Sequence, residues 1–245
     1  MGVGGGILLV PLLTHVLRRP QHEAHGTSLA FIISTSLAAT ALYVRQEHVR
    51  VPLAAFLAAG AVPGVMLGAR LARAMSARRL RQAFGLLLLA TAVRILALPP
   101  SPQAAGAPWP PALEIGLGAV AGVLAGLLGV GGGIIIVPVL VLAQHVEQHT
   151  AQGVSLLMIL PTALVGAVSH ARHGHVATRL LPPLMIGGAA GAVGGALLAD
   201  RINAPALSRL FALLLLPVAV QMIWSRPGRS ATVAATPPPA DGGST

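Results

Sequence analysis

The chain contains the same glycine-rich sequence twice. Residues 2–7 read G-V-G-G-G-I, and residues 129–134 repeat them letter for letter, each copy leading into a Val-Pro pair. The offset is 129 − 2 = 127 residues, and it also relates Gln21-His22 to Gln148-His149 without a gap. One unit has therefore been duplicated, and the sequence predicts two related halves.

The composition places this duplicated chain in a lipid bilayer. Hydrophobic residues make up 55% of it and charged residues 9%, with a mean hydropathy of +0.80, values that lie far outside those of a soluble domain. Six apolar runs each approach the ~20 residues of a spanning helix: 24–44, 52–72, 80–98, 151–171, 180–199 and 206–224. We therefore expect an all-α fold, a polytopic transmembrane helical bundle of two tandem four-helix repeats with a broken first helix in each.

The basic residues support membrane anchoring over nucleic-acid binding. The formal charge is +10, but every basic residue apart from histidine is an arginine, and these arginines flank the apolar runs. The densest group, residues 70–81, is predicted to be cytoplasmic, although the arginine counts on the two sides of the membrane are too similar to fix the orientation. The absence of Lys beside abundant Ala, Arg, Gly and Pro suggests a bacterium of high G+C content, so we expect a multi-pass protein of the inner membrane.

The chain divides into four segments. Residues 1–98 form the first membrane repeat, 99–111 a Pro-rich linker, 112–224 the second repeat, and 225–245 a tail with too little apolar surface to fold. A helix over all of 112–143 would be ~48 Å long, against a hydrocarbon core of ~30 Å. We expect it to break at the glycines of 129–133, into half-helices ending near 128 and beginning near 134. The counterpart of 112–128 would precede Met1, so the repeat predicts a half-helix encoded upstream.

The glycine clusters are candidates for an anion site. Irregular backbone at membrane depth survives only where protein or a water-filled cavity surrounds it, and its free N–H groups, with the positive end of the following half-helix, suit an anion. The simpler alternative is that the glycines permit close helix packing. Duplication of the whole motif in an over-long segment favours the anion site.

A second motif is repeated at 21–29 and 148–156, where Gln, His, Ala, Gly, Ser and Leu are kept. Gln, Ser and backbone donors can hold oxyanion oxygens without adding a charge. Alternatively, the serines bond back to their own helices and the histidines lie at the headgroup level. The candidate substrate-binding residues are Gly4, Gly5, Gly6, Gln21, Gly26 and Ser28, and their counterparts Gly131, Gly132, Gly133, Gln148, Gly153 and Ser155.

Other patterns indicate packing, and no metal, cofactor or enzyme. The stripes Gly60-Gly64-Gly68 and Gly187-Gly191-Gly195 each lie on one helix face and favour close helix contact. The nine histidines invite a metal hypothesis, but the pairs at 145/149 and 173/175 lie on opposite sides of a predicted span. No Asp or Glu lies inside a predicted span, which favours anionic over cationic cargo. We find no HExxH, paired carboxylate or nucleophile elbow, so no enzyme activity is expected.

At these residues the chain resembles the TauE/SafE family of sulfite and sulfoacetate exporters. The resemblance covers most of 2–224 and rests on G-x-G-G-G-x-x-x-V-P in both halves and A-x-G-x-S-L at 24–29 and 151–156. It implies a permease for a small sulfur-containing anion, with the bilayer and that anion as partners and no nucleic acid; a homo-oligomer stays open. The alternatives are a divalent-metal transporter using loop histidines, which metal-dependent binding would indicate, and a non-transporting scaffold subunit, which no ligand would stabilise.

Overall fold

A computed structural model describes residues 2, 4–71, 77–97, 109–128, 132–172, 174 and 176–224. Within these ranges the chain is helical and forms no strand. The elements are α1 (Gly6–Pro11), the π-helical turn η1 (Leu12–Val16), α2 (Gln21–Arg45), α3 (Val51–Leu71), α4 (Ala77–Ala97), α5 (Pro111–Leu128), α6 (Gly133–Ala143), α7 (Gln148–Arg172), α8 (Leu181–Asp200) and α9 (Ala204–Trp224). The predicted tail, most of the predicted linker, and Gly131 lie outside the described residues.

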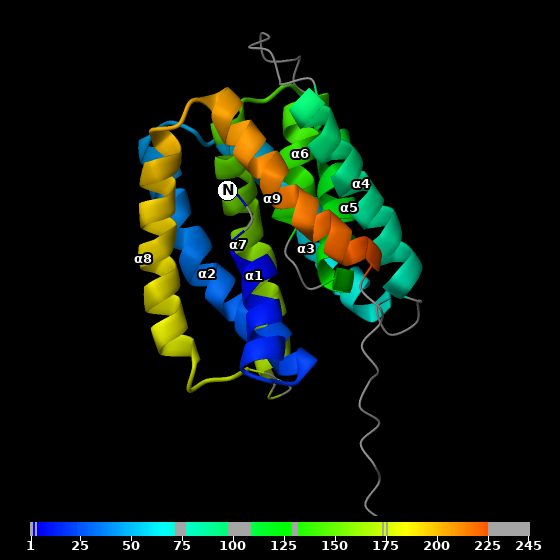
Figure 1. The fold of residues 1–245 in the computed structure, drawn as a ribbon, viewed down its shortest axis with the longest axis vertical. Helices are drawn as coiled ribbons and strands as arrows, with labels where there is room; N and C mark the ends of the chain where they lie inside the picture. The colour runs from blue at the N-terminus through cyan, green and yellow to red at the C-terminus, as the bar shows by residue number, and fades with distance from the viewer. Residues whose placement is uncertain are drawn as a thin grey trace, which may run out of the picture.

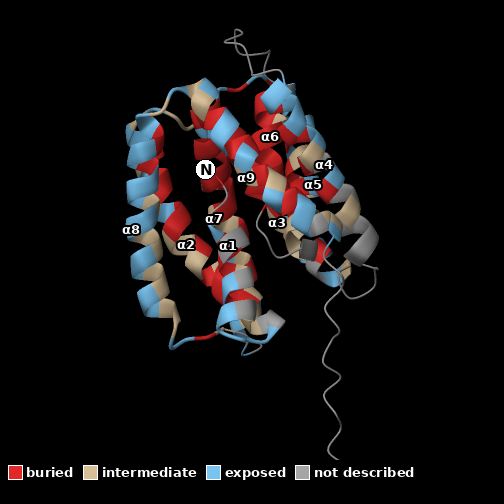
Figure 2. Ribbon diagram, viewed as in Figure 1, coloured by how far each residue is buried: buried red, intermediate tan, exposed pale blue. Residues whose placement is uncertain are grey.

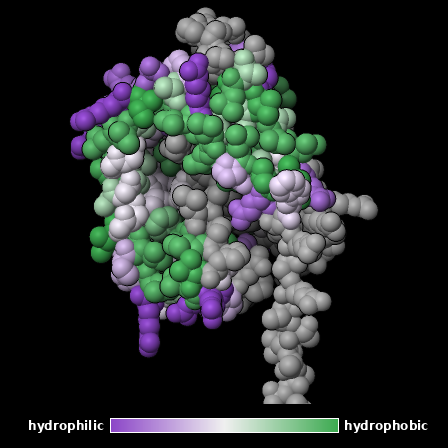
Figure 3. Space-filling view, in the orientation of Figure 1, coloured by the Kyte–Doolittle hydropathy of each residue, from purple (hydrophilic) through white to green (hydrophobic). Residues whose placement is uncertain are grey.

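Five of these helices are long and apolar enough to cross a membrane: α2, α3, α7, α8 and α9. Shorter apolar stretches lie in α4, α5 and α6. Figure 3 shows hydrophilic side chains gathered mostly at the upper and lower ends of the view, with apolar surface between them. A multi-pass membrane protein has this distribution, because only the ends of its helices meet water.

The over-long apolar run of the second half breaks where its length predicts. Helix α5 ends at Leu128 and α6 begins at Gly133, with Gly132 as the residue that precedes it. Helix α6 is short, and eight of its eleven residues are buried. A short helix enclosed by protein is how a membrane protein accommodates backbone that lipid cannot satisfy.

Helix α7 is the most enclosed of the five candidate spans, with 67% of its apolar window buried. It packs against α2, α3, α6 and α9, while α2 also contacts α1 and α8, and α4 pairs with α9 (Figure 1). Figure 2 shows the buried residues concentrated on α6, α7 and the inward faces of α2 and α9. The α2–α7 pair therefore forms the centre of the bundle, and any site within it is walled by these two helices.

The glycine stripe of α3 packs on α5, as predicted. A Cβ at Gly64 would stand 2.5 Å from the carbonyl oxygen of Ala119, and one at Gly60 or Gly68 would overlap the oxygens of Ile115 or Val123. In return, α5 presents its own glycines at positions 118 and 122 to the backbone of α3. The two backbones are thus in direct contact, which only residues without a Cβ allow.

The prediction of the same contact at Gly187, Gly191 and Gly195 is wrong for the described structure. No atom lies within 4 Å of a Cβ built at any of the three. Helix α8 forms an outer edge of the bundle in Figure 1, and only 6% of its apolar window is buried. The reason is geometric: α5 covers the stripe on α3, and none of the described helices takes the equivalent place on α8.

Candidate functional site

The two glycine-rich segments meet at the α2–α7 pair. A Cβ at Gly133 would overlap the carbonyl oxygen of Gly2 and stand 2.6 Å from the hydroxyl of Ser155. A Cβ at Gly2 would stand 3.0 Å from the Cα of Gln152. Segments that lie more than a hundred residues apart in the sequence are therefore in backbone contact, which requires glycine at position 133.

The first glycine segment also needs glycine for its conformation. Gly2, Gly4 and Gly5 have φ of +71°, +68° and +75°, in the left-handed region that side chains disfavour. The carbonyl of Gly4 accepts a hydrogen bond from the Thr35 hydroxyl at 3.0 Å. Consecutive residues in such conformations can turn several N–H groups to one side, an arrangement found in anion-binding loops.

The two repeated serines occupy matching positions but differ in bonding. The hydroxyl of Ser155 donates to the carbonyl of Gly2 at 2.8 Å. The hydroxyl of Ser28, 3.0 Å from a Cβ built at Gly6, is buried and makes no hydrogen bond. The interpretation that these serines bond back to their own helices is therefore wrong for both. Each hydroxyl instead faces a glycine segment.

Further polar side chains extend from this point along α2. Ser36 and Thr40 are buried, and neither hydroxyl has a hydrogen-bond partner. The Ser36 hydroxyl lies 3.3 Å from a Cβ built at Gly4. On the facing helix, the side-chain NH₂ of Gln152 is also unpartnered. Unsatisfied buried donors are costly in apolar surroundings, so this group is suited to a ligand that accepts hydrogen bonds.

Sequence reasoning missed Ser36, Thr40 and Tyr43. Their spacing of four and then three residues places them on one face of α2, and a polar stripe inside an apolar helix was the available signal. Their partner Gln152 was not predictable, because Tyr43 donates to its Oε1 at 2.7 Å across 109 residues of sequence.

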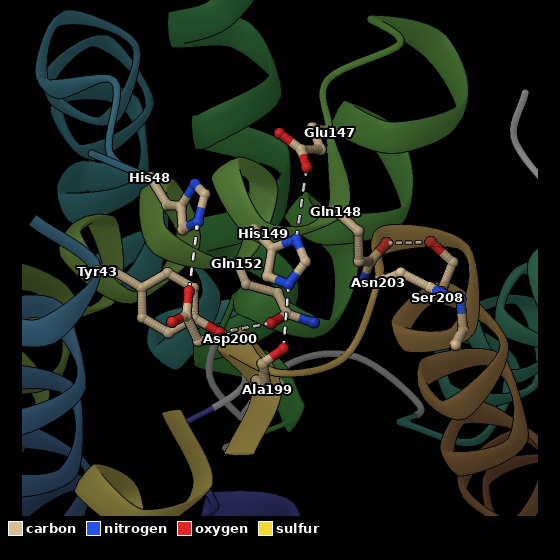
Figure 4. Close-up of polar contacts among 11 residues, drawn as sticks. Tyr43, His48, Glu147, Gln148, His149, Gln152, Ala199, Asp200, Asn203 and Ser208 are labelled. Atoms are coloured by element: carbon tan, nitrogen blue, oxygen red, sulfur yellow. Dashed lines mark hydrogen bonds and ion pairs between the residues drawn. The ribbon is translucent and has the colours of Figure 1, made fainter. Parts of the chain in front are cut away.

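The Tyr43–Gln152 hydrogen bond lies within a polar cluster, which Figure 4 shows. The ring of His48 stacks on that of His149 with centroids 5.1 Å apart, and its Nε2 lies 3.7 Å from a carboxylate oxygen of Asp200. The Nε2 of His149 contacts the carbonyl of Ala199 at 3.1 Å. These contacts join the α2–α3 connection, the start of α7 and the end of α8, and so cover this end of the α2–α7 pair.

The remaining predicted residues fall into three groups. Gly153 lets the backbone of His48 approach α7, since a Cβ there would overlap the carbonyl oxygen of His48. Gln148 is buried, and its Oε1 accepts a hydrogen bond from Ser208 of α9 at 3.2 Å. Gly26 is buried in α2, and Gly132 lies 3.2 Å, at its Cβ position, from the Met158 methyl group. The Gln21 side chain and Gly131 are outside what the structure describes.

The described part of the chain holds no group of three His, Asp or Glu side chains that could bind a metal ion. The faces of α2 and α7 that meet the glycine segments carry Ser, Thr and Gln, so the donors assembled here are neutral. A neutral donor set suits an anion that is stripped of water only in part, because it binds without forming a buried ion pair.

Comparison with known proteins identifies the family. The model of the family described as sulfite exporter TauE/SafE matches residues 1–222. The chain belongs to the TauE/SafE family. A probable membrane transporter protein of Xylella fastidiosa (strain 9a5c) is 31% identical over 231 residues, which cover 91% of this chain and 88% of that protein.

Other TauE/SafE-like relatives have similar names. The probable membrane transporter protein YunE of Bacillus subtilis is 29% identical over 221 residues, covering 78% of this chain and 81% of that protein. No solved structure matches the chain. The family, these relatives and the five apolar helices show a multi-pass membrane transporter of the TauE/SafE family.

Proposed function

We propose that this TauE/SafE protein transports a small sulfur-containing anion, such as sulfite or sulfoacetate, across the bacterial inner membrane. The carrying observation is that both glycine segments meet at the α2–α7 pair beside buried hydroxyls of Ser28 and Ser36 that have no partner. An oxyanion oxygen would accept from those hydroxyls and from the Gln152 amide. The backbone N–H groups around Gly4 to Gly6 and at the start of α6 would supply further donors.

We further propose that the bundle consists of two tandem four-helix repeats. Helices α2 and α7 differ by 127 residues at both ends, as do α4 and α9, and α6 matches the combined span of α1 and η1. The local contacts repeat as well: Gly6 faces Ser28 and Ile32, and Gly133 faces Ser155 and Ile159. Two inverted halves around one central site would allow transport by rocking between two states.

The test is transport by purified protein in proteoliposomes. Efflux of radiolabelled sulfite and sulfoacetate is measured in wild type, in Ser28→Ala and Ser36→Ala, and in the control Ser34→Ala. Ser34 lies on the same helix, but its hydroxyl bonds the carbonyl of Phe31 at 2.8 Å. We expect the control to transport like wild type and the first two variants to be impaired. Equal activity in all four proteins would refute the site.

A ligand panel separates the rival functions. Thermal unfolding is recorded with sulfite, thiosulfate, sulfoacetate, sulfate, Ni²⁺ and Zn²⁺. Stabilisation by the sulfur anions supports the proposal. Stabilisation by a metal ion alone would favour a metal transporter, and stabilisation by none of them would favour a scaffold subunit.

A further inference from the structure

The two ends of the α2–α7 pair are in different states. At one end Tyr43 and Gln152 are fully buried and joined by a hydrogen bond of 2.7 Å. The other end has a pocket of about 90 Å³, which His25 of α2 and His170 of α7 help to line. This volume equals the share of about three liquid waters. One end of the pair is therefore closed, and the other is hollow.

The residues at these ends are counterparts in the internal repeat. Adding 127 to Tyr43 gives His170, and subtracting 127 from Gln152 gives His25. The Tyr43–Gln152 pair and the His170–His25 pair are thus built at the same two positions of the duplicated unit. The same positions are bonded at one end and border a pocket at the other.

One continuous helix face connects the two pairs. On α2 it consists of residues spaced by four or three, and so lies along one side of the helix: His25, Leu29, Ile32, Ser36, Thr40 and Tyr43. The first and last of these are 18 residues apart, which corresponds to ~27 Å of helix and so to about the thickness of the hydrocarbon core. The two pairs therefore stand near opposite faces of the membrane.

The inner end of the pocket reaches the glycine segments. Ile32 and Ile159 both line it. A Cβ built at Gly6 would stand 2.5 Å from the Cδ1 of Ile32, and one built at Gly133 would stand 2.6 Å from the Cδ1 of Ile159. A solute in the pocket is therefore separated from the glycine backbone by these two side chains alone.

We propose that this pocket is the open mouth of the transport path, and that His25 and His170 are the gate that closes it when Tyr43 and Gln152 separate. The inference rests on the proposed transport function and adds the two gates to it. Neutral imidazoles can donate and accept, so the histidine pair can form the bond that Tyr43 and Gln152 form in the closed end. The solute would enter beside the histidines, reach the serines at the centre, and leave past Tyr43.

The experiment uses the natural absence of cysteine. Val165→Cys reports on the pocket, which its side chain lines, and Ala39→Cys reports on the closed end, where Ala39 is buried with Tyr43. Labelling of each by a small water-soluble thiol reagent is followed in proteoliposomes. In otherwise wild-type protein we expect the pocket reporter to react faster than the closed-end reporter.

Two changes should then move both reporters in opposite directions. Tyr43→Phe keeps the ring and removes one hydrogen bond from the closed end. The exchange His25→Gln with His170→Tyr installs the closed-end pair at the mouth. Each should slow labelling at position 165 and speed labelling at position 39, by roughly 2- to 10-fold, the factor that one hydrogen bond contributes to an equilibrium. Ser34→Ala, which touches neither pair, should change neither rate.

The outcomes separate this proposal from the proposed function. Unchanged rates in well-folded Tyr43→Phe and exchange variants, or both reporters accelerating together, would overturn the gates, whichever anion is carried. Reciprocal changes without transport of any sulfur anion would support the gates and refute the cargo. If one variant does not fold, the other still decides, because each acts at a different end.

Discussion

Ser28 and Ser155 form a natural matched pair for separating a binding role from a structural one. Both are fully buried at the same position of the repeat, but only Ser155 has a hydrogen-bond partner, the carbonyl of Gly2. Ser155→Ala leaves that carbonyl without its partner, which costs about 1–3 kcal/mol of unfolding free energy. Ser28→Ala removes a hydroxyl that is already unsatisfied, so the free energy of unfolding should stay constant or rise.

The effect on ligand binding should be the reverse for Ser28. A hydrogen bond to a charged group contributes about 1.5–3 kcal/mol, so Ser28→Ala should weaken binding of the transported anion by roughly 10- to 150-fold. The assay is thermal unfolding in detergent, with and without sulfite. A chain of this length shifts by about 2–4 °C per kcal/mol, so Ser155→Ala should melt several degrees lower and Ser28→Ala should lose most of the sulfite-induced shift.

One result would refute this reasoning. If Ser28→Ala is destabilised as much as Ser155→Ala and binds sulfite with unchanged affinity, then Ser28 is a packing residue, and the hydroxyl is not available to a ligand. Ser34→Ala again serves as the control, because its hydroxyl is bonded within α2.

Three further predictions concern the glycines and the histidines. Gly64→Leu should prevent α5 from packing on α3, at a cost of about 1–3 kcal/mol or more, whereas Gly191→Leu on the open face of α8 should leave the melting temperature within a few degrees of wild type; equal destabilisation would contradict the observed asymmetry. Gly132→Leu should abolish efflux while membrane insertion, measured by fractionation, is kept; wild-type efflux would remove this glycine from the site. Joint substitution of His145 and His149 by Ala should leave efflux largely intact, as should EDTA, and a metal-dependent loss would revive the metal-transporter alternative.

The bilayer explains why much of the fold was predictable from sequence. The lengths of the apolar runs and the excess length of 112–143 predicted α2, α3, α7 and the break before Gly133. The hydrocarbon thickness imposes these lengths on any spanning chain. Helix partners are not imposed in this way. The same glycine stripe packs on α5 when it belongs to α3 and is open when it belongs to α8, because the contact depends on whether another helix is present to make it.

The candidate site was predictable only in its repeated part. Gly6, Ser28 and their counterparts were found because duplication marks them, and the structure brings them together. Tyr43 and Gln152 escaped because their bond joins positions that the repeat does not pair in sequence. A duplicated motif indicates which positions matter, whereas contacts between the two copies follow from how the copies are inverted and packed.

The positions at which the two copies agree and differ follow the proposed mechanism. Gly6, Ser28, Leu29 and Ile32 have identical counterparts 127 residues later, and they surround the place where the glycine segments meet. Along the same face the copies differ toward the ends, where Tyr43 corresponds to His170. A central site must bind the solute in both states of a transporter, so selection there acts equally on both copies. The gates must break alternately, and pairs with different bonds allow the two states to have different stabilities. Divergence confined to the ends is what a duplicated carrier with one shared site and two unequal gates requires.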